Sequence, residues 1–260
     1  SLSSRRAIPL QSSGRLSSRK QDREAGGPGW GLVAQVSWWS RGKADRTGTD
    51  ALAKRLAPIA AETPADSRDV RGSHAAEYFF QHLRDTPAAD ILDLGMLSQE
   101  TTTQLGALGH RLNFTSLMVD YDKERPKLAG KDGQVSRRAA DRFFRRHLDY
   151  PAHSFQAALA WDVLQHLDKH AMQSAITRLR QLLKPGSAML CLFQDPREDG
   201  TVSIFNGAVC SHASLRLQEV ERRPPCQVLQ PGDLELEFPR FRSIDLFLKR
   251  GRLLEVLVMG

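Results

Sequence analysis

The chain has 260 residues, of which 40% are hydrophobic and 26% are charged. This composition is typical of a globular protein and excludes a fibrous or wholly disordered one. No stretch approaches the roughly 18 apolar residues that a membrane-spanning helix needs, so we expect no membrane partner. The cysteines, at positions 191, 210 and 226, lack C-x-x-C spacing. They therefore favour the cytoplasm over a disulfide framework, and they predict no structural metal site.

The formal net charge of +7 is concentrated at the N-terminal end of the chain. Residues 1–60 contain 11 Lys or Arg and 4 Asp or Glu, and the rest of the chain is balanced. The charge therefore does not indicate a nucleic-acid partner for the folded part. Residues 1–70, rich in Ser, Arg and Gly, are predicted to be a disordered tail and linker, and 71–260 to form one domain. A mitochondrial transit peptide, an expression remnant and a start site placed too far upstream stay open as explanations of the tail.

Local signals predict one helix and then alternating strands and helices. Ser73 and Glu77 stand where a helix N-terminus is expected, and apolar spacing continues that helix to Arg84. From Ala89 onward, short apolar strands alternate with helices, a pattern typical of parallel βαβ units. We predict strands over 91–94, 115–119, 155–161, 188–193 and 215–220, helices over 101–108, 134–148 and 170–183, loops around Pro224-Pro225 and Pro231-Gly232, and a hairpin of 243–248 with 253–259.

Several of these segments carry motifs in a set order: Ile91-Leu92-Asp93-Leu94-Gly95, then Asp120, then Leu148-Asp149, then the strand 155–161 running into Asp162-Val163-Leu164-Gln165-His166-Leu167, then Leu183-Lys184-Pro185-Gly186, and last the strand at 254–258. In content and order they resemble the class I S-adenosylmethionine (SAM) methyltransferases, over essentially the whole chain after His74. The resemblance implies an α/β, Rossmann-like doubly wound fold. Its mostly parallel sheet would have seven strands and a C-terminal antiparallel hairpin.

The resemblance also implies a SAM site at the carboxyl ends of the strands, where doubly wound sheets bind their ligands. Asp93 and Gly95 would frame the methionine moiety, Asp120 the ribose and Asp149 the adenine amino group. Asp122 competes with Asp120 for the ribose. Each carboxylate taken alone can equally be a strand-end cap or turn former.

The loop after Gly95 departs from the Gly-x-Gly of the family. Met96 and Leu97 put side chains where the backbone should approach the cofactor. Glu100 suits the first turn of a helix but would repel the SAM carboxylate. Ser98 can cap that helix, the interpretation we favour, or offer its hydroxyl to the ligand. This loop is the basis of the alternative hypothesis below.

Asp162 and His166 are the candidate catalytic bases for an acceptor that must lose a proton. His166 can instead be a surface histidine at a helix start, which we favour. Trp161 can line the adenine or acceptor pocket, or belong to the core. The Asp/Asn-Pro-Pro-aromatic motif of amino-directed methyltransferases and the Pro-Cys nucleophile of cytosine-C5 enzymes are both missing. We therefore expect a small-molecule acceptor.

The helix predicted over 134–148 is rich in arginine. Arg138, Arg142 and Arg146 fall on one of its faces. An acidic substrate or a nucleic-acid backbone could meet them. A solvated basic face is the simpler interpretation, and few aromatic residues accompany it, so nucleic acid is not indicated.

Two functional hypotheses follow. The leading one is a SAM-dependent methyltransferase of the cytoplasm that acts on an unidentified small molecule. The alternative is a catalytically inactive, methyltransferase-like binding or assembly protein. A nucleotide-dependent oxidoreductase is disfavoured because G-x-G-x-x-G is absent. The sequence does not indicate the oligomeric state.

Overall fold

The computed structural model describes residues 69–249 and 252–260. The tail expected at 1–70 therefore lies almost wholly outside the described residues. Among the described helices, none is long and apolar enough to cross a membrane.

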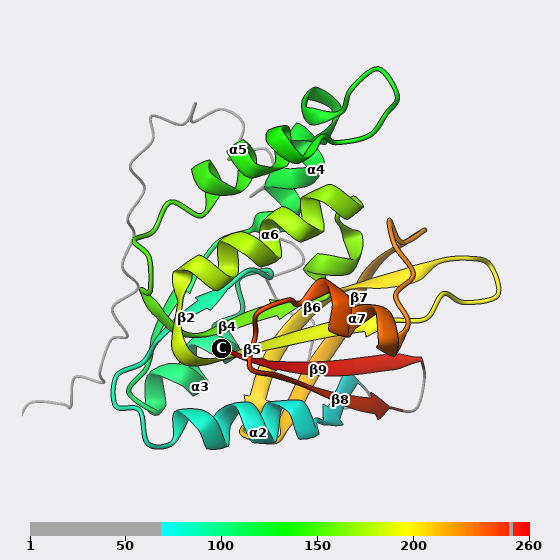
Figure 1. Cartoon of the computed structure of the whole chain (residues 1–260). Helices are drawn as coiled ribbons and strands as arrows, with labels where there is room; N and C mark the ends of the chain where they lie inside the picture. The colour runs from blue at the N-terminus through cyan, green and yellow to red at the C-terminus, as the bar shows by residue number, and fades with distance from the viewer. Residues whose placement is uncertain (1–68, 250–251) are drawn as a thin grey trace, which may run out of the picture. The chain divides into compact units, whose positions relative to one another are not determined.

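A six-stranded mixed sheet forms the centre of this part of the chain (Figure 1). The strand order is β3-β2-β4-β5-β9-β8. The first four strands are parallel, and β9 and β8 are antiparallel to their neighbours. The strands are β2 (Asp90–Asp93), β3 (Arg111–Phe114), β4 (Phe155–Trp161), β5 (Leu183–Gln194), β8 (Ser243–Lys249) and β9 (Leu253–Met259).

Helices cover both faces of this sheet (Figure 1). One face carries α2 (His74–Leu83) and α3 (Gln99–Ala107), and the other carries α4 (Leu117–Leu128), α5 (Arg137–His147) and α6 (Lys169–Leu182). A short 3-10 helix, η2 (Val163–His166), joins β4 to α6, and α7 (Pro231–Glu237) precedes β8. This three-layer arrangement with a parallel centre and a C-terminal antiparallel pair is the Rossmann-like α/β fold that the motifs predict.

Strand alternation explains how the two faces acquire separate cores. In β4, Ala158 and Ala160 belong to the cluster under α4–α6, whereas Leu159 and Trp161 belong to the cluster under α2 and α3. Successive side chains of a strand point to opposite faces. A central strand covered on both sides must therefore be apolar at every position, as β4 nearly is.

A second, smaller sheet consists of two strands between β5 and α7 and one strand that precedes α2. It has the order β1-β7-β6 and is antiparallel, with β1 (Val70–Gly72), β6 (Val202–Ser211) and β7 (Ser214–Arg223). The strand expected at 215–220 lies within β7. The expectation of a seven-stranded central sheet is therefore wrong, because β7 pairs with β6 and β1 rather than with the parallel strands.

Most other elements lie where the sequence predicts them. The hydroxyl of Ser73 accepts from Ala76 N (3.0 Å) at the start of α2, and Gly109 ends α3 with a φ of +80°. The strand predicted over 115–119 is wrong, because that segment enters α4. The loop predicted at Pro231-Gly232 is also wrong, because proline in a first helical turn is favourable and α7 begins there.

Candidate functional site

Asp93 ends strand β2 at the carboxyl-end edge of the sheet. Its side chain is buried, and its Oδ1 accepts hydrogen bonds from Gly95 N (2.9 Å) and Trp161 Nε1 (2.7 Å). Burial raises the pKa of this carboxyl to about 6, although both donors act to lower it. Both hydrogen-bond donors to Asp93 therefore come from the protein itself.

Trp161, the last residue of β4, fills the space beside Asp93. It has a φ of +48°, and only 1% of its surface is exposed. Its indole lies between two glycines. A Cβ on Gly95 would come within 2.7 Å of Trp161 Nε1, and a Cβ on Gly207 of β6 within 2.7 Å of Cζ3. Both glycines are thus needed for the indole to fit, since neither position has room for a methyl group.

Strand β6 crosses this edge and is held there by side chains from the strand ends. Phe205 N donates to Asp162 Oδ2 (2.9 Å), Val209 N donates to Thr101 Oγ1 (3.0 Å), and Ser203 N donates to Gln194 Oε1 (3.1 Å). These contacts attach β6 to the ends of β4 and β5 and to the start of α3. The edge where a doubly wound sheet binds its ligand is covered by the chain's own backbone.

The loop after Gly95 is also engaged internally. Ser98 is the N-cap of α3, with its hydroxyl accepting from Thr101 N (3.2 Å), so the capping role is confirmed. The carboxylate of Glu100 pairs with Arg216 of β7 at 2.7 Å. Leu97 is 53% exposed. The loop therefore leads into a helix whose first turn is attached to the second sheet through Glu100 and Arg216.

Asp162 and His166 lie together, but they are buried. His166 Nε2 is 3.5 Å from Asp162 Oδ2, and the side chains are 0% and 3% exposed. Within the described part of the chain, neither ring nitrogen of His166 has a hydrogen-bond partner. The expectation of a surface histidine is therefore wrong. The pair has the composition of a general base with its orienting acid, but its carboxylate also holds β6.

Asp120 does not lie at the end of a strand. The second strand, β3, ends at Phe114, and Asp120 lies in the first turn of α4. Its carboxylate is 3.3 Å from His147 Nδ1, and Asp122 pairs with Arg223 at 2.8 Å. Thr115 and Ser116 follow β3 directly. The placement that gave Asp120 a ribose-binding role is wrong, since no acid closes this strand.

Asp149 lies at the opposite edge of the sheet from Asp93. It follows α5 and is exposed. Arg178, late in α6, donates to the carbonyls of Leu148 (2.8 Å) and Tyr150 (3.0 Å). β5 begins just after α6, so this segment lies near the amino ends of the parallel strands. The adenine-binding role predicted for Asp149 has no support from this position.

Gly207 and strand β6 were not predicted from the sequence. The signal was present, because residues 202–209 are rich in apolar and β-branched residues. A glycine inside such a run marks a place where another group approaches the backbone closely. Which group approaches could not be read from the sequence, since Trp161 is remote along the chain.

The residues at this edge do not fit SAM as they are arranged. The space at the switch between β2 and β4 contains the indole of Trp161, Oδ1 of Asp93 already accepts two hydrogen bonds from within the chain, and β3 lacks a terminal acid. No cluster of metal-ligating side chains occurs among the described residues.

Comparison with solved structures finds similarity to SAM-dependent methyltransferases. One is the 1,6-didemethyltoxoflavin-N1-methyltransferase of Burkholderia thailandensis, solved with bound 1,6-didemethyltoxoflavin and S-adenosylhomocysteine. It is 14% identical, with 88% of this chain and 97% of that chain covered and a TM-score of 0.42. Another is a SAM-dependent methyltransferase of Aquifex aeolicus, 11% identical, with 79% and 97% covered and a TM-score of 0.41.

A third is the N-methyltransferase NodS of Bradyrhizobium japonicum, solved with S-adenosylhomocysteine. It is 14% identical, with 80% of this chain and 97% of that chain covered and a TM-score of 0.38. No protein-family model and no curated protein matches the chain. The strand order and strand directions of the central sheet define the fold.

Proposed function

We propose that this chain is a methyltransferase-like protein that does not turn over SAM and acts by binding another molecule. The observation that carries the proposal is Trp161, whose indole fills the space between Gly95 and Gly207 and donates to Asp93. A cofactor could enter only if this side chain and the β6 backbone both moved. Moving the indole would leave a buried carboxyl with a single donor, which is costly.

A second candidate function is a methyltransferase that opens before it binds SAM. The buried pair of Asp162 and His166 favours it, because an acid beside a histidine is a usual arrangement for removing a proton from an acceptor. The two candidates differ in whether the folded protein binds the cofactor at all.

Calorimetric titration of the whole chain with SAM and with S-adenosylhomocysteine tests the proposal. We expect no saturable heat at millimolar ligand. Saturable binding to the wild-type protein would overturn the proposal and favour the second candidate. This titration needs no variant, so it does not depend on the stability of a substituted protein.

Trp161→Ala then tests whether the indole is what closes the site. Removing a buried aromatic side chain costs about 3–5 kcal/mol. The matched control is Phe144→Ala, a buried aromatic in the cluster on the other face of the sheet. Binding of S-adenosylhomocysteine by the Trp161 variant alone would show a cofactor site closed by this side chain. If neither variant binds S-adenosylhomocysteine, the loop after Gly95 and the end of β3 must also contribute to the loss of cofactor binding.

A further inference from the structure

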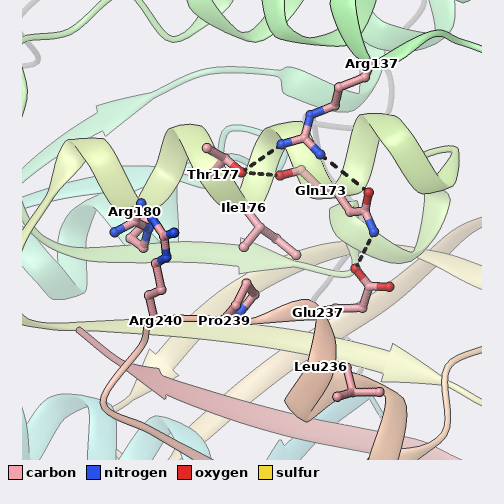
Figure 2. A pocket seen from close by; sticks show the side chains of 9 residues that line it. All are labelled: Arg137, Gln173, Ile176, Thr177, Arg180, Leu236, Glu237, Pro239 and Arg240. Carbon is pink, nitrogen blue, oxygen red and sulfur yellow. Dashed lines mark hydrogen bonds between the residues drawn. The ribbon is translucent and has the colours of Figure 1, made fainter.

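A cavity of about 500 Å³ lies away from the Trp161 site, between three segments of the chain. The start of α5, the outer face of α6 and the segment from α7 to Arg240 form its walls (Figure 2). Its lining residues are Arg137, Gln173, Ile176, Thr177, Arg180, Leu236, Glu237, Pro239 and Arg240. The volume is in the range of small-molecule sites, roughly 300–1,000 Å³.

One wall of the cavity is held in place by a chain of hydrogen bonds. Arg137 donates to Gln173 Oε1 (3.5 Å) and to Thr177 Oγ1 (3.3 Å), and Gln173 Nε2 donates to Glu237 Oε2 (3.1 Å). Figure 2 shows this chain crossing from α5 through α6 to α7. Glu237, the only carboxylate among the described lining residues, is therefore bound to an amide and not to a guanidinium.

The other wall presents two arginines that lack an acidic partner. Within the described residues, neither Arg180 nor Arg240 makes an ion pair or a side-chain hydrogen bond, and both line the same cavity. Figure 2 shows Arg240 extending from its loop toward α6, where Arg180 lies. Arg240 is exposed and Arg180 is half-buried, so both guanidinium groups are open to a ligand from solvent. An anion bound between them would relieve the repulsion of two like charges.

The backbone at Arg240 is unfavourable for a residue with a side chain. Its φ is +70°, in the region that glycine adopts most readily. The strain comes at a position whose guanidinium borders the cavity. The free-energy cost of this backbone strain is of order 1 kcal/mol or more, and binding of an anion by Arg240 would offset it.

We infer that this cavity binds a small phosphomonoester with an apolar body. Arg137 is paired with Asp141 (3.3 Å), so the charges left for a ligand are those of Arg180 and Arg240. These two positive charges match the dianion of a phosphomonoester near neutral pH. The fork of a guanidinium fits phosphate oxygens in pairs. Leu236, which is 78% exposed, and Pro239 supply an apolar wall for the rest of the ligand.

The test is calorimetric titration of the whole chain with phenyl phosphate, inorganic phosphate and benzoate. We expect phenyl phosphate to bind at least tenfold more tightly than either of the others, because only it has both the dianion and the apolar ring. No saturable heat with phenyl phosphate at millimolar concentration would overturn the inference. Benzoate binding as tightly as phenyl phosphate would also overturn it, because the site would then select carboxylates.

Substitutions place the binding in the cavity. Arg180→Gln should weaken phenyl phosphate binding tenfold or more, since hydrogen bonds to charged groups are worth that much. The matched control is Arg138→Gln, which removes the same charge from an exposed position of α5 outside the lining. If both variants lose the same affinity for phenyl phosphate, net charge rather than the cavity sets the binding, and the inference is contradicted.

Arg240→Gly separates binding from folding. Glycine accepts the φ of Arg240 without strain, so this variant should melt no lower than the wild type while binding phenyl phosphate at least tenfold more weakly. Unchanged affinity in this variant would exclude Arg240 as a ligand and overturn the two-arginine site. The SAM titration is a separate measurement, so either proposal can fail without the other.

Discussion

The buried carboxyl of Asp93 predicts an unusual dependence of stability on pH. Its pKa is about 6 in the folded protein against 3.8 for an ordinary Asp. Because the folded-state pKa is raised, the folded chain binds more protons than the unfolded chain between these values. The stability that Asp93 contributes is therefore fully present below pH 3.8 and is lost as the pH rises through about 6.

The magnitude follows from the difference between the two pKa values. One pKa unit corresponds to about 1.4 kcal/mol, so burial of the ionised carboxyl costs about 3 kcal/mol at pH 8 and about 1 kcal/mol at pH 4.5. Asp93→Asn removes the charge but keeps an oxygen that can accept from Gly95 N and Trp161 Nε1. The variant should therefore gain about 2 kcal/mol relative to the wild type between pH 4.5 and pH 8.

Urea denaturation followed by circular dichroism at pH 4.5, 6 and 8 measures this gain for both proteins. Comparing two proteins at each pH cancels the titration of every other group. A difference that stays constant with pH, or that shifts against the variant as pH rises, would refute the argument. It would mean that Asp93 is solvated or has a cationic partner, as a working ligand-binding carboxylate would.

Three further predictions concern other contacts. Gly207→Ala should destabilise the protein by about 1–3 kcal/mol in urea denaturation, because the added methyl overlaps Trp161; an equal loss on a Trp161→Ala background would contradict this packing. Hydrogen bonding to Asp120 and Glu124 raises the pKa of His147, so its stabilisation is fully present below about pH 6.5 and lost as pH rises through the folded-state pKa. Denaturation of wild type and His147→Gln at pH 5.5 and pH 9 checks this, and a difference that grew with pH would have the wrong sign. Ser73→Ala should cost about 1–2 kcal/mol, because it removes the α2 cap and a donor to buried Glu255 (2.9 Å). Ser73→Thr keeps the hydroxyl and should lose less, and equal losses would argue against the cap.

Local sequence determined much of the fold. The strand predicted over 155–161 has the bounds of β4, because an apolar run covered on both faces is distinctive. Ser73 and Gly109 mark helix ends because each acts on residues close to it in the sequence. The Ser73 hydroxyl accepts from Ala76 N, and Gly109 adopts a positive φ. The strand predicted over 115–119 failed because a short apolar run such as 117–119 fits a helix as well as a strand.

Only the tertiary structure decided the state of the site. Asp93, Trp161, Asp162 and His166 do meet at one edge of the sheet, as the motifs predict, but the motifs do not say what their side chains bind. Asp93 is engaged by Trp161 and Asp162 by β6, and both contacts depend on a glycine and a strand far along the chain. Strand ends are set by local residues, whereas the space beside them is set by whichever distant segment packs there. The sequence therefore predicts where such a site should lie, and the packing of Trp161 against Gly207 decides that this space is filled.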